Sequence, residues 1–345
     1  MAPTKSLAAA VLFSGLLACT VYTVAIHFDK SGGALLLEKS CPPARIKEYG
    51  AKYGVGIEAV DGFLCALDTF FQASFQPPIM DFMRIFLLNG PVVNFVMLLE
   101  ASRDDRPYIA YFPLIFGILT QTITAALASS IFWTLFTIQA CFGGSRQAKA
   151  PVSRAAVEAA FLAVLLGYGI PTTWMIATES SLAVSLWQPF PVYMSIIYNA
   201  WLFYRSKASK ESGWGLAQLA LIFLSGVGSI SWVYILLPHL SKNAIWDALN
   251  WLPSWNVPNP ATTTVTSAVL HVLQYDALWM FASTILAALF LSQDKSDLFF
   301  SIQTLPLLVV AFGPGAVVGG LWLFREMQLM IQAEEKRRAA ESKKR

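Results

Sequence analysis

The sequence has few charged side chains for its length. Charged residues make up 13% of the 345 residues, whereas hydrophobic residues make up 56%. The mean hydropathy of +0.56 is typical of a polytopic membrane protein, and it leaves no stretch polar enough for a soluble domain of ordinary size. We therefore predict an all-α bundle of about eight membrane-spanning helices, within a range of about seven to nine.

Residue types that bind metals are also scarce. The three histidines, His27, His239 and His271, form no HxxxH or HxxH pair, and none of the four cysteines lies in a CxxC pair. These spacings favour neither a zinc site nor a His-rich di-iron site, and they suggest no disulfide framework. We expect no metal and no cofactor.

Several motifs of known enzyme classes are missing. The sequence contains no Gly-x-Ser-x-Gly elbow, no P-loop and no HExxH pair. It lacks the paired Asp-x-x-x-Asp runs with which membrane prenyltransferases hold magnesium, and it has no Asn-x-Ser/Thr sequon. The basic run after Arg325 is a short tail rather than a basic domain, so we predict no nucleic-acid partner.

Apolar runs separated by charged or helix-breaking residues predict about eight spans. They lie near residues 7–26, 81–100, 108–141, 156–178, 188–204, 214–238, 262–292 and 298–323. We expect residues 1–323 to form a single transmembrane domain. We predict that residues 324–345 form a basic cytosolic helical tail, because positive charge favours the cytosolic side.

The predicted spans do not give a consistent membrane topology. The loops at 142–154 and 205–213 are both basic, and they can share the cytosolic side. An odd number of predicted spans then separates the second loop from the basic tail, which would place the tail on the wrong side. Either one late segment does not cross the membrane, or one predicted span is two.

Residues 56–76 predict an amphipathic helix with an acidic face. The polar positions recur at spacings of three and four, at Glu58, Asp61, Cys65, Asp68, Gln72 and Gln76. One interpretation is a helix on the membrane surface. The alternative is a helix that lines a cavity, because surface helices usually carry lysine and arginine whereas this face is acidic.

Asp68 is a candidate proton donor on this helix. Gln72 follows it by one turn and could orient its carboxyl. A desolvated carboxyl has a raised pKa and can keep its proton near neutral pH. A solvated acidic stripe is the alternative interpretation of the same residues.

The apolar stretch from Pro77 to Pro107 carries ionisable residues at both ends. Asp81 and Arg84 precede an uncharged segment that ends before Glu100. That segment is shorter than the about 20 residues that cross the hydrocarbon, so at least one charged end must lean inward. Charges at membrane depth persist mostly beside a partner or a polar cavity. Ion pairing at the two helix ends is the alternative.

The middle of the same stretch combines a helix breaker with a polar residue. Pro91 removes a backbone hydrogen bond to the Leu87 carbonyl and bends the helix. Asn94 adds a polar side chain at depth. A bend with polar groups is a common way to build a pocket, although helix packing uses the same features.

Polar and aromatic side chains also gather in the run 262–292. One helical face carries Thr264, Ser267, His271, Gln274 and Tyr275, with Asp276 just off it and Trp279 a turn beyond. A lone membrane histidine is usually a hydrogen bond between helices. The cluster as a whole raises the case for a functional site.

The run from Gln76 to Arg84, continued by Asn89-Gly90-Pro91 and Glu100-Ala101-Ser102-Arg103, resembles a family of fungal integral-membrane terpene cyclases. The ascofuranone type is the named example, with relatives in indole-diterpene gene clusters. The order of the spans, the acidic segment and the basic tail are similar too. The resemblance implies a multi-pass enzyme of the endoplasmic reticulum that needs no metal. It implies that a carboxylic acid protonates and cyclises an epoxyprenyl chain joined to an aromatic, polyketide or indole head group.

We expect three carboxyls as candidate acids and expect them to share one enclosed cavity: Asp68, Glu100 and Asp276. We expect further side chains to contact the substrate: Gln72, Asp81, Arg84, Asn94, His271, Tyr275 and Trp279. The expected partners are an isoprenoid substrate, the lipid bilayer and possible pathway enzymes in the same membrane. A small transporter or channel with buried charges is the alternative function, and an assembly subunit is a third.

Overall fold

The chain is helical throughout the part that the structure describes. The computed structural model describes residues 3–77, 79–142, 148–205, 211–241, 251–291 and 295–342. Over these ranges no strand is present, and the β-type pairing is an isolated bridge between Ser153 and Ser212. The predicted all-α class is confirmed.

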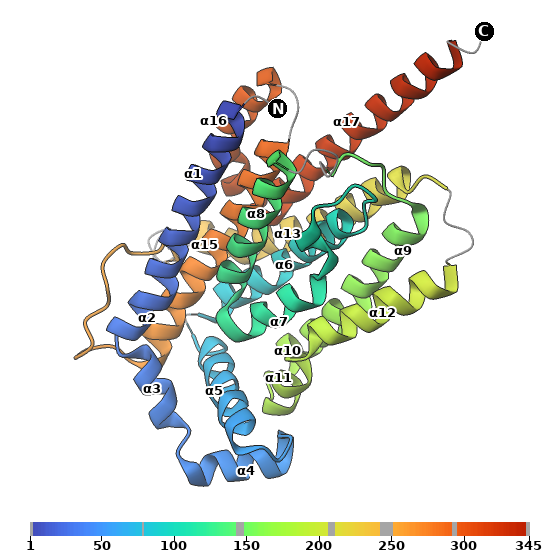
Figure 1. Cartoon of the computed structure of the whole chain (residues 1–345). Helices are drawn as coiled ribbons and strands as arrows, with labels where there is room; N and C mark the ends of the chain where they lie inside the picture. The colour runs from blue at the N-terminus through green and yellow to red at the C-terminus, as the bar shows by residue number, and fades with distance from the viewer. Residues whose placement is uncertain are drawn as a thin grey trace.

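The helices follow one another with short connections. The first part of the chain contains α1 (Pro3–Thr20), a π-helical turn (Val21–Ile26), α2 (His27–Lys30), α3 (Gly33–Ser40), α4 (Pro43–Tyr53), α5 (Glu58–Ser74), α6 (Met80–Ala101), a 3-10 turn (Tyr108–Tyr111), α7 (Pro113–Ile123) and α8 (Ala125–Phe142). The second part contains α9 (Arg154–Leu162), a π-helical segment (Ala163–Gly169), α10 (Ile170–Thr178), α11 (Ser181–Trp187), α12 (Phe190–Arg205), α13 (Trp214–Ser241), α15 (Val265–Leu291), α16 (Lys295–Phe312) and α17 (Pro314–Ser342). Figure 1 shows α17 projecting from the bundle, and α4 at the opposite end of the molecule.

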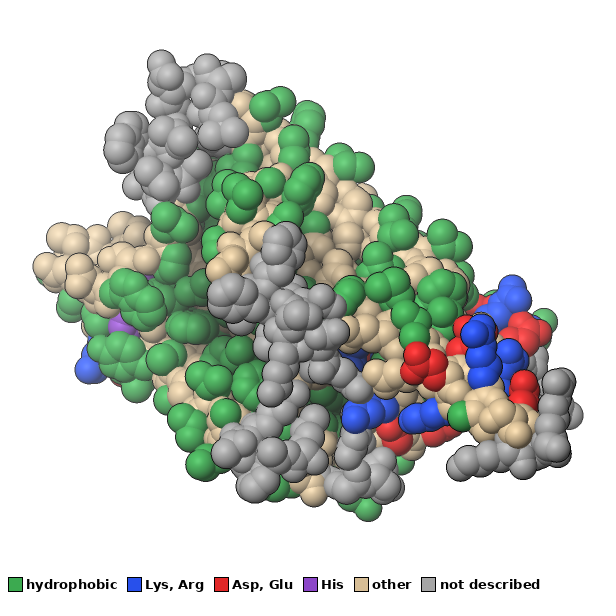
Figure 2. Space-filling view, turned by 90° about the horizontal axis from the view of Figure 1, so that it is seen from above, with side chains coloured by type: hydrophobic (Ala, Val, Ile, Leu, Met, Phe, Trp, Pro, Cys, Tyr) green, Lys and Arg blue, Asp and Glu red, His purple; other side chains and the backbone are tan. Residues whose placement is uncertain are grey.

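Six helical stretches in the described ranges are long and apolar enough to cross a membrane. They are Leu7–Lys30, Met80–Ala101, Ala125–Phe142, Arg154–Thr178, Trp214–Pro238 and Val265–Leu291. Hydrophobic side chains cover much of the face in Figure 2, and charged side chains gather at one end of it. The expected count of about eight spans is not confirmed.

The predicted span 108–141 is wrong, because the chain breaks at Thr124. This residue has a φ of 95°, a left-handed conformation that ends α7 and lets α8 start in a new direction. Of the two helices, only α8 is long enough to be a candidate span, and α7 is a shorter apolar helix. Excess length over a single crossing was the sequence signal for this break.

The predicted span 298–323 is also wrong as a single crossing. Gly313, with a φ of 84°, separates α16 from α17, and a side chain there would be strained and crowded by Trp232. Gly315 N donates a hydrogen bond of 3.0 Å to Asn89, midway along α6. Arg325, further along α17, donates to the carbonyl of Leu291 at the end of α15. The chain therefore enters the bundle along α16 and returns along α17 to the side it came from.

This return places the start of the tail at the same end of the bundle as the basic loops. Arg325 donates a hydrogen bond of 2.6 Å to the carbonyl of Ala148 in the loop before α9. Ser153 in the same loop pairs with Ser212 in the loop before α13. The residues expected to begin a separate tail at 324 continue α17 without a break.

Cys41 and Cys65 form a disulfide, so the expectation of no disulfide is wrong for this pair. The two cysteines are 24 residues apart in sequence. They meet because α4 turns the chain back and packs against α5. Spacing along the chain carries no sign of that turn, since the cysteines lie in no CxxC pattern. The disulfide lies at the end of the bundle where α6 begins, opposite the basic loops.

A buried ion cluster joins α6 to α17. Glu100 accepts hydrogen bonds of 2.9 Å from Arg103 and 3.3 Å from Arg325, and Arg103 also pairs with Glu326. Trp322 donates a further hydrogen bond of 3.1 Å to Glu100. The four ionic side chains are at most 3% exposed, and their two positive and two negative charges compensate one another. Buried charges are tolerated when they are paired and hydrogen-bonded in this way.

We predict that Glu100→Ala lowers the free energy of unfolding by about 3–5 kcal/mol, because it removes the carboxylate that two buried guanidinium groups share. Thermal unfolding of the purified protein in detergent measures the change. The control is Glu341→Ala, whose carboxyl is 67% exposed and 3.9 Å from Arg337, and which should unfold like the wild type. Equal unfolding temperatures for both variants would contradict a stabilising cluster.

Candidate functional site

A cavity of about 430 Å³ lies between the N-terminal helices, α5, α6, α8 and α15. We name it the aromatic cavity, because aromatic rings line much of it: Phe28, Phe63, Phe70, Phe71, Phe86, Tyr168, Trp187 and Phe190. The rings on α5 come from the apolar side of the predicted amphipathic helix. That helix therefore contributes to a cavity through its apolar residues rather than through its acidic face.

The charged residues that line the aromatic cavity are both acidic. Asp276 on α15 is buried, whereas Asp29 at the end of α2 is exposed. Asp276 accepts a hydrogen bond of 2.5 Å from Ala126 N, in the first turn of α8. Among the described residues no basic side chain forms an ion pair with Asp276.

The break at Thr124 explains why a carboxyl can sit beside Ala126. A helix start leaves backbone N–H groups without intrahelical acceptors and carries a partial positive charge. Because α8 starts inside the bundle, its free N–H groups face a neighbouring helix instead of water. Asp276 satisfies one of them while its side chain borders the cavity.

The part of α6 around Pro91 forms one wall of the aromatic cavity. Pro91 cannot donate to the Leu87 carbonyl, and the Tyr168 hydroxyl donates a hydrogen bond of 2.9 Å to that carbonyl instead. A Cβ at Gly90 would lie 3.1 Å from the Tyr168 hydroxyl oxygen, so glycine permits the close approach. The predicted pocket at the proline is thus present, with the phenol replacing the missing backbone donor.

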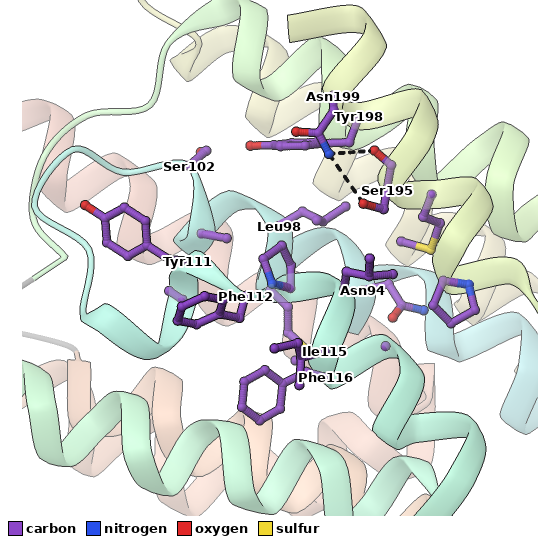
Figure 3. Close-up of a pocket in the computed structure, with 18 of the residues that line it drawn as sticks. Asn94, Leu98, Ser102, Tyr111, Phe112, Ile115, Phe116, Ser195, Tyr198 and Asn199 are labelled. Carbon is purple, nitrogen blue, oxygen red and sulfur yellow. Dashed lines mark hydrogen bonds between the residues drawn. The ribbon is translucent and has the colours of Figure 1, made fainter.

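A second cavity, of about 680 Å³, lies beside the first, between α6, α7, α9 and α12. We name it the Arg106 cavity, because Arg106 is the charged side chain in its lining among the described residues. Figure 3 shows Ser195, Tyr198 and Asn199 on one side of the cavity and the rings of Phe112 and Phe116 on the other. Its wall is more polar than that of the aromatic cavity.

The two cavities adjoin one another along α6. Both are lined by the same four residues, Asn94, Met97, Thr120 and Phe190. Asn94, which the sequence suggests as a substrate contact, is therefore at the boundary. Its side-chain amide has no hydrogen bond to another described residue, so it is available to a bound molecule.

The three candidate acids do not share one cavity, and that expectation is wrong. Only Asp276 lines the aromatic cavity, and none of the three lines the Arg106 cavity. Glu100 belongs to the buried ion cluster, as the ion-pairing alternative expects. Asp68 on α5 faces α11, where it accepts a hydrogen bond of 3.1 Å from Ser181.

A separate polar group surrounds Glu179, between α10 and α11, outside the lining of both cavities. Arg84 lies 3.4 Å from the Glu179 carboxylate and 3.5 Å from Asp81. Gln72 donates a hydrogen bond of 3.2 Å to the Glu179 carbonyl. The three expected substrate contacts Gln72, Asp81 and Arg84 are therefore together, but they hold the ends of α5, α6 and α10.

The aromatic and histidine cluster on α15 contacts the N-terminal helices. His271 lies 3.0 Å from His27 between ring nitrogens, and Trp279 donates a hydrogen bond of 2.8 Å to Thr23. Tyr275 donates to the Ser254 carbonyl at 2.8 Å. None of the three expected contacts lines either cavity. They join helices, as the alternative interpretation of a membrane histidine expects.

Two charged residues at the cavities were not singled out from the sequence. Asp29 lies three residues beyond the predicted first span, and Arg106 is one of several charged residues that follow the second. Their role depends on which helices pack beside them, which sequence spacing does not show. No group of three or more His, Cys, Asp or Glu side chains in the described ranges is placed to hold a metal ion.

Comparison with known families gives one match. The model of the CtvD domain family matches residues 8–330, a range that includes every lining residue of both cavities. CtvD is a fungal cluster protein, which is consistent with a fungal biosynthetic family. Neither the curated proteins nor the solved structures contain a match to the chain.

The burial of Asp68 can be tested through the pH dependence of protein stability. Burial raises the pKa of its carboxyl, although hydrogen bonds from Ser181 and Gln72 lower it in part. The folded state then binds a proton more tightly than the unfolded chain does, so stability falls as the pH rises above the ordinary value for aspartate. We predict that Asp68→Asn raises the unfolding temperature at pH 7 and that the gain shrinks as the pH approaches about 4.

Thermal unfolding in detergent across this pH range measures the effect. The matched control is Asp104→Asn, an exposed carboxyl that should show no such gain. A lower unfolding temperature for Asp68→Asn at pH 7, or a gain that does not depend on pH, would show that burial does not govern this carboxyl.

Proposed function

The chain belongs to the CtvD family, and from that premise we propose that it is a membrane-bound terpene cyclase of fungal secondary metabolism. In this proposal the substrate is an epoxyprenyl chain joined to an aromatic, polyketide or indole head group. The observation that carries the proposal is the aromatic cavity, whose wall contains the buried carboxyl of Asp276. Among the described residues this carboxyl has no ion-pair partner.

The aromatic cavity suits an isoprenoid chain in size and in chemistry. Its volume of about 430 Å³ falls among ordinary small-molecule sites. Each CH₂ group moved from water into such a site is stabilised by about 0.8 kcal/mol. Aromatic faces also attract a cation, so the rings of Phe70, Phe86 and Trp187 could stabilise positive charge as it forms on the chain.

The proposed reaction begins with proton transfer from Asp276. The carboxylic acid gives its proton to the epoxide oxygen, and the carbon–oxygen bond opens with its electron pair on oxygen. A neighbouring double bond then attacks the carbon and closes a ring. A proton finally passes from the last cation back to the Asp276 carboxylate, directly or through a water molecule, so the acid is restored and the product is an isomer of the substrate.

Asp276 suits this step better than Glu100 does. Two guanidinium groups already compensate the charge of Glu100, and that carboxylate lies away from both cavities. Asp276 has no cation beside it, and its hydrogen bond from Ala126 N stabilises the carboxylate that proton transfer leaves behind.

The proposed location is the endoplasmic reticulum membrane, with the disulfide end in the lumen. Disulfides persist in oxidising compartments, and the Cys41–Cys65 bond is at the end opposite the basic loops. Basic loops favour the cytosolic side. The two signals therefore agree on one orientation.

We predict that microsomes carrying the chain convert an epoxyfarnesyl phenol into a cyclic product of unchanged mass. Asp276→Asn should lower the rate by at least about 100-fold, because it cannot donate the proton. It keeps an oxygen that can accept from Ala126 N, so the fold should persist. Mass spectrometry with chromatographic separation measures the product.

Asp104→Asn, an exposed carboxyl away from both cavities, is the control and should turn over like the wild type. Wild-type turnover by Asp276→Asn would remove the proposed acid. Absence of any isomeric product from wild-type microsomes, across phenol, polyketide and indole head groups, would overturn the cyclase proposal.

Engineered glycosylation sites test the orientation. The paired change Val55→Asn and Ile57→Thr places a sequon in the exposed turn between α4 and α5, and we expect it to be glycosylated in the lumen. Ala340→Asn creates a sequon with Ser342 near the end of α17, and we expect no glycosylation there. A shift in gel mobility that glycosidase reverses reports each outcome. The opposite pattern would reverse the orientation.

A further inference from the structure

The Arg106 cavity is larger than the aromatic cavity and has the opposite charge. Among the described lining residues, Arg106 is the charged side chain of the first, and Asp29 and Asp276 are those of the second. The two cavities share Asn94 and Met97 on α6. The two cavities therefore meet at these residues, with a cationic side chain in the lining of one and acidic side chains in the lining of the other.

Arg106 is held in place rather than free to swing. Its Nη1 donates a hydrogen bond of 2.7 Å to the Arg103 carbonyl, and its guanidinium carbon lies 3.8 Å from the centre of the Tyr111 ring. An arginine held over an aromatic face keeps its positive charge in a defined position.

Neutral donors and acceptors complete the polar side of this cavity. Figure 3 shows Asn199 hydrogen-bonded to Ser195, with Tyr198 beside them and the ring of Phe112 on the other side of the cavity. Flat aromatic surfaces favour a flat ligand through stacking. A fixed guanidinium favours an oxygen that carries negative charge. The lining thus combines the two features that an acidic aromatic ring would require.

We propose that the Arg106 cavity binds the head of the substrate, an aromatic ring with an acidic oxygen such as a carboxylate, while the isoprenoid chain extends past Asn94 into the aromatic cavity. This inference takes its substrate class from the proposed function and adds the direction in which the substrate lies. That direction places the far end of the chain, rather than the head, beside Asp276. Asn94 becomes the contact at the junction of head and chain.

Photoaffinity labelling of the full chain in detergent tests the direction. Two probes share a farnesyl chain on 4-hydroxybenzoate, and a diazirine stands either on the ring or at the far end of the chain. We expect the ring probe to label residues 111–117 or 190–202, and the chain-end probe to label 63–71 or 272–280. Labelling of the same peptides by both probes, or the reverse pattern, would overturn the proposal.

Variants and a neutral probe test the role of charge. Arg106→Gln should lower labelling by the ring probe about tenfold, the loss of one charge-assisted hydrogen bond, and Arg106→Lys should restore most of it. The control Arg154→Gln, an exposed arginine outside both cavities, should label like the wild type. A methyl ester of the ring probe that labels as strongly as the carboxylate would overturn recognition of the charge.

A second variant covers the case in which Arg106→Gln fails to fold. Ser195→Phe fills the Arg106 cavity from α12 and should abolish ring-probe labelling there, and unchanged labelling would contradict the proposal. Labelling needs no turnover. If the probes label in the expected direction but no substrate is cyclised, the cyclase proposal is overturned and the binding direction stands. If substrate is cyclised but both probes label the same cavity, the binding direction is overturned and the cyclase proposal stands.

Discussion

The buried ion cluster of Glu100, Arg103, Arg325 and Glu326 is the constraint on which the remaining architecture depends. It fixes the end of α6 against α17, while Arg325 also reaches the end of α15 and the loop before α9. Ionic side chains out of water are tolerated only in a narrow geometry, so the cluster sets the position of α6 closely. That position matters because α6 forms the wall between the two cavities and contributes Asn94 and Met97 to both.

Two chain breaks, one between α7 and α8 and one between α16 and α17, place helix ends inside the bundle. The break at Thr124 starts α8 inside the bundle, where its free N–H groups meet Asp276, and the break at Gly313 turns α17 back toward Glu100. Irregular backbone at membrane depth is tolerated where it is buried in protein or lines a cavity. The same two breaks account for the candidate acid at the aromatic cavity and for the shared side of the basic loops and the tail.

The sequence predicted the helical class and the membrane character, because local composition and helical spacing carry those signals. It also singled out Asn94, which lines both cavities. It also pointed to Asp276, but in a cluster whose other members, His271 and Trp279, join helices instead. Spacing along one helix shows which residues share a face, whereas the partner of that face depends on packing between distant segments. The Cys41–Cys65 disulfide, the burial of Arg325 and the cavity roles of Asp29 and Arg106 all depend on such packing.

The central claim is that an isoprenoid chain lies in the aromatic cavity with its reacting end beside Asp276. An experimental structure with an unreactive analogue bound, in which an aziridine nitrogen replaces the epoxide oxygen, tests this claim most directly. We expect density for the chain along Phe70 and Phe86, with the nitrogen at about 3 Å from the Asp276 carboxylate. Density for the analogue beside Asp68 and α11, or outside both cavities, would contradict the account.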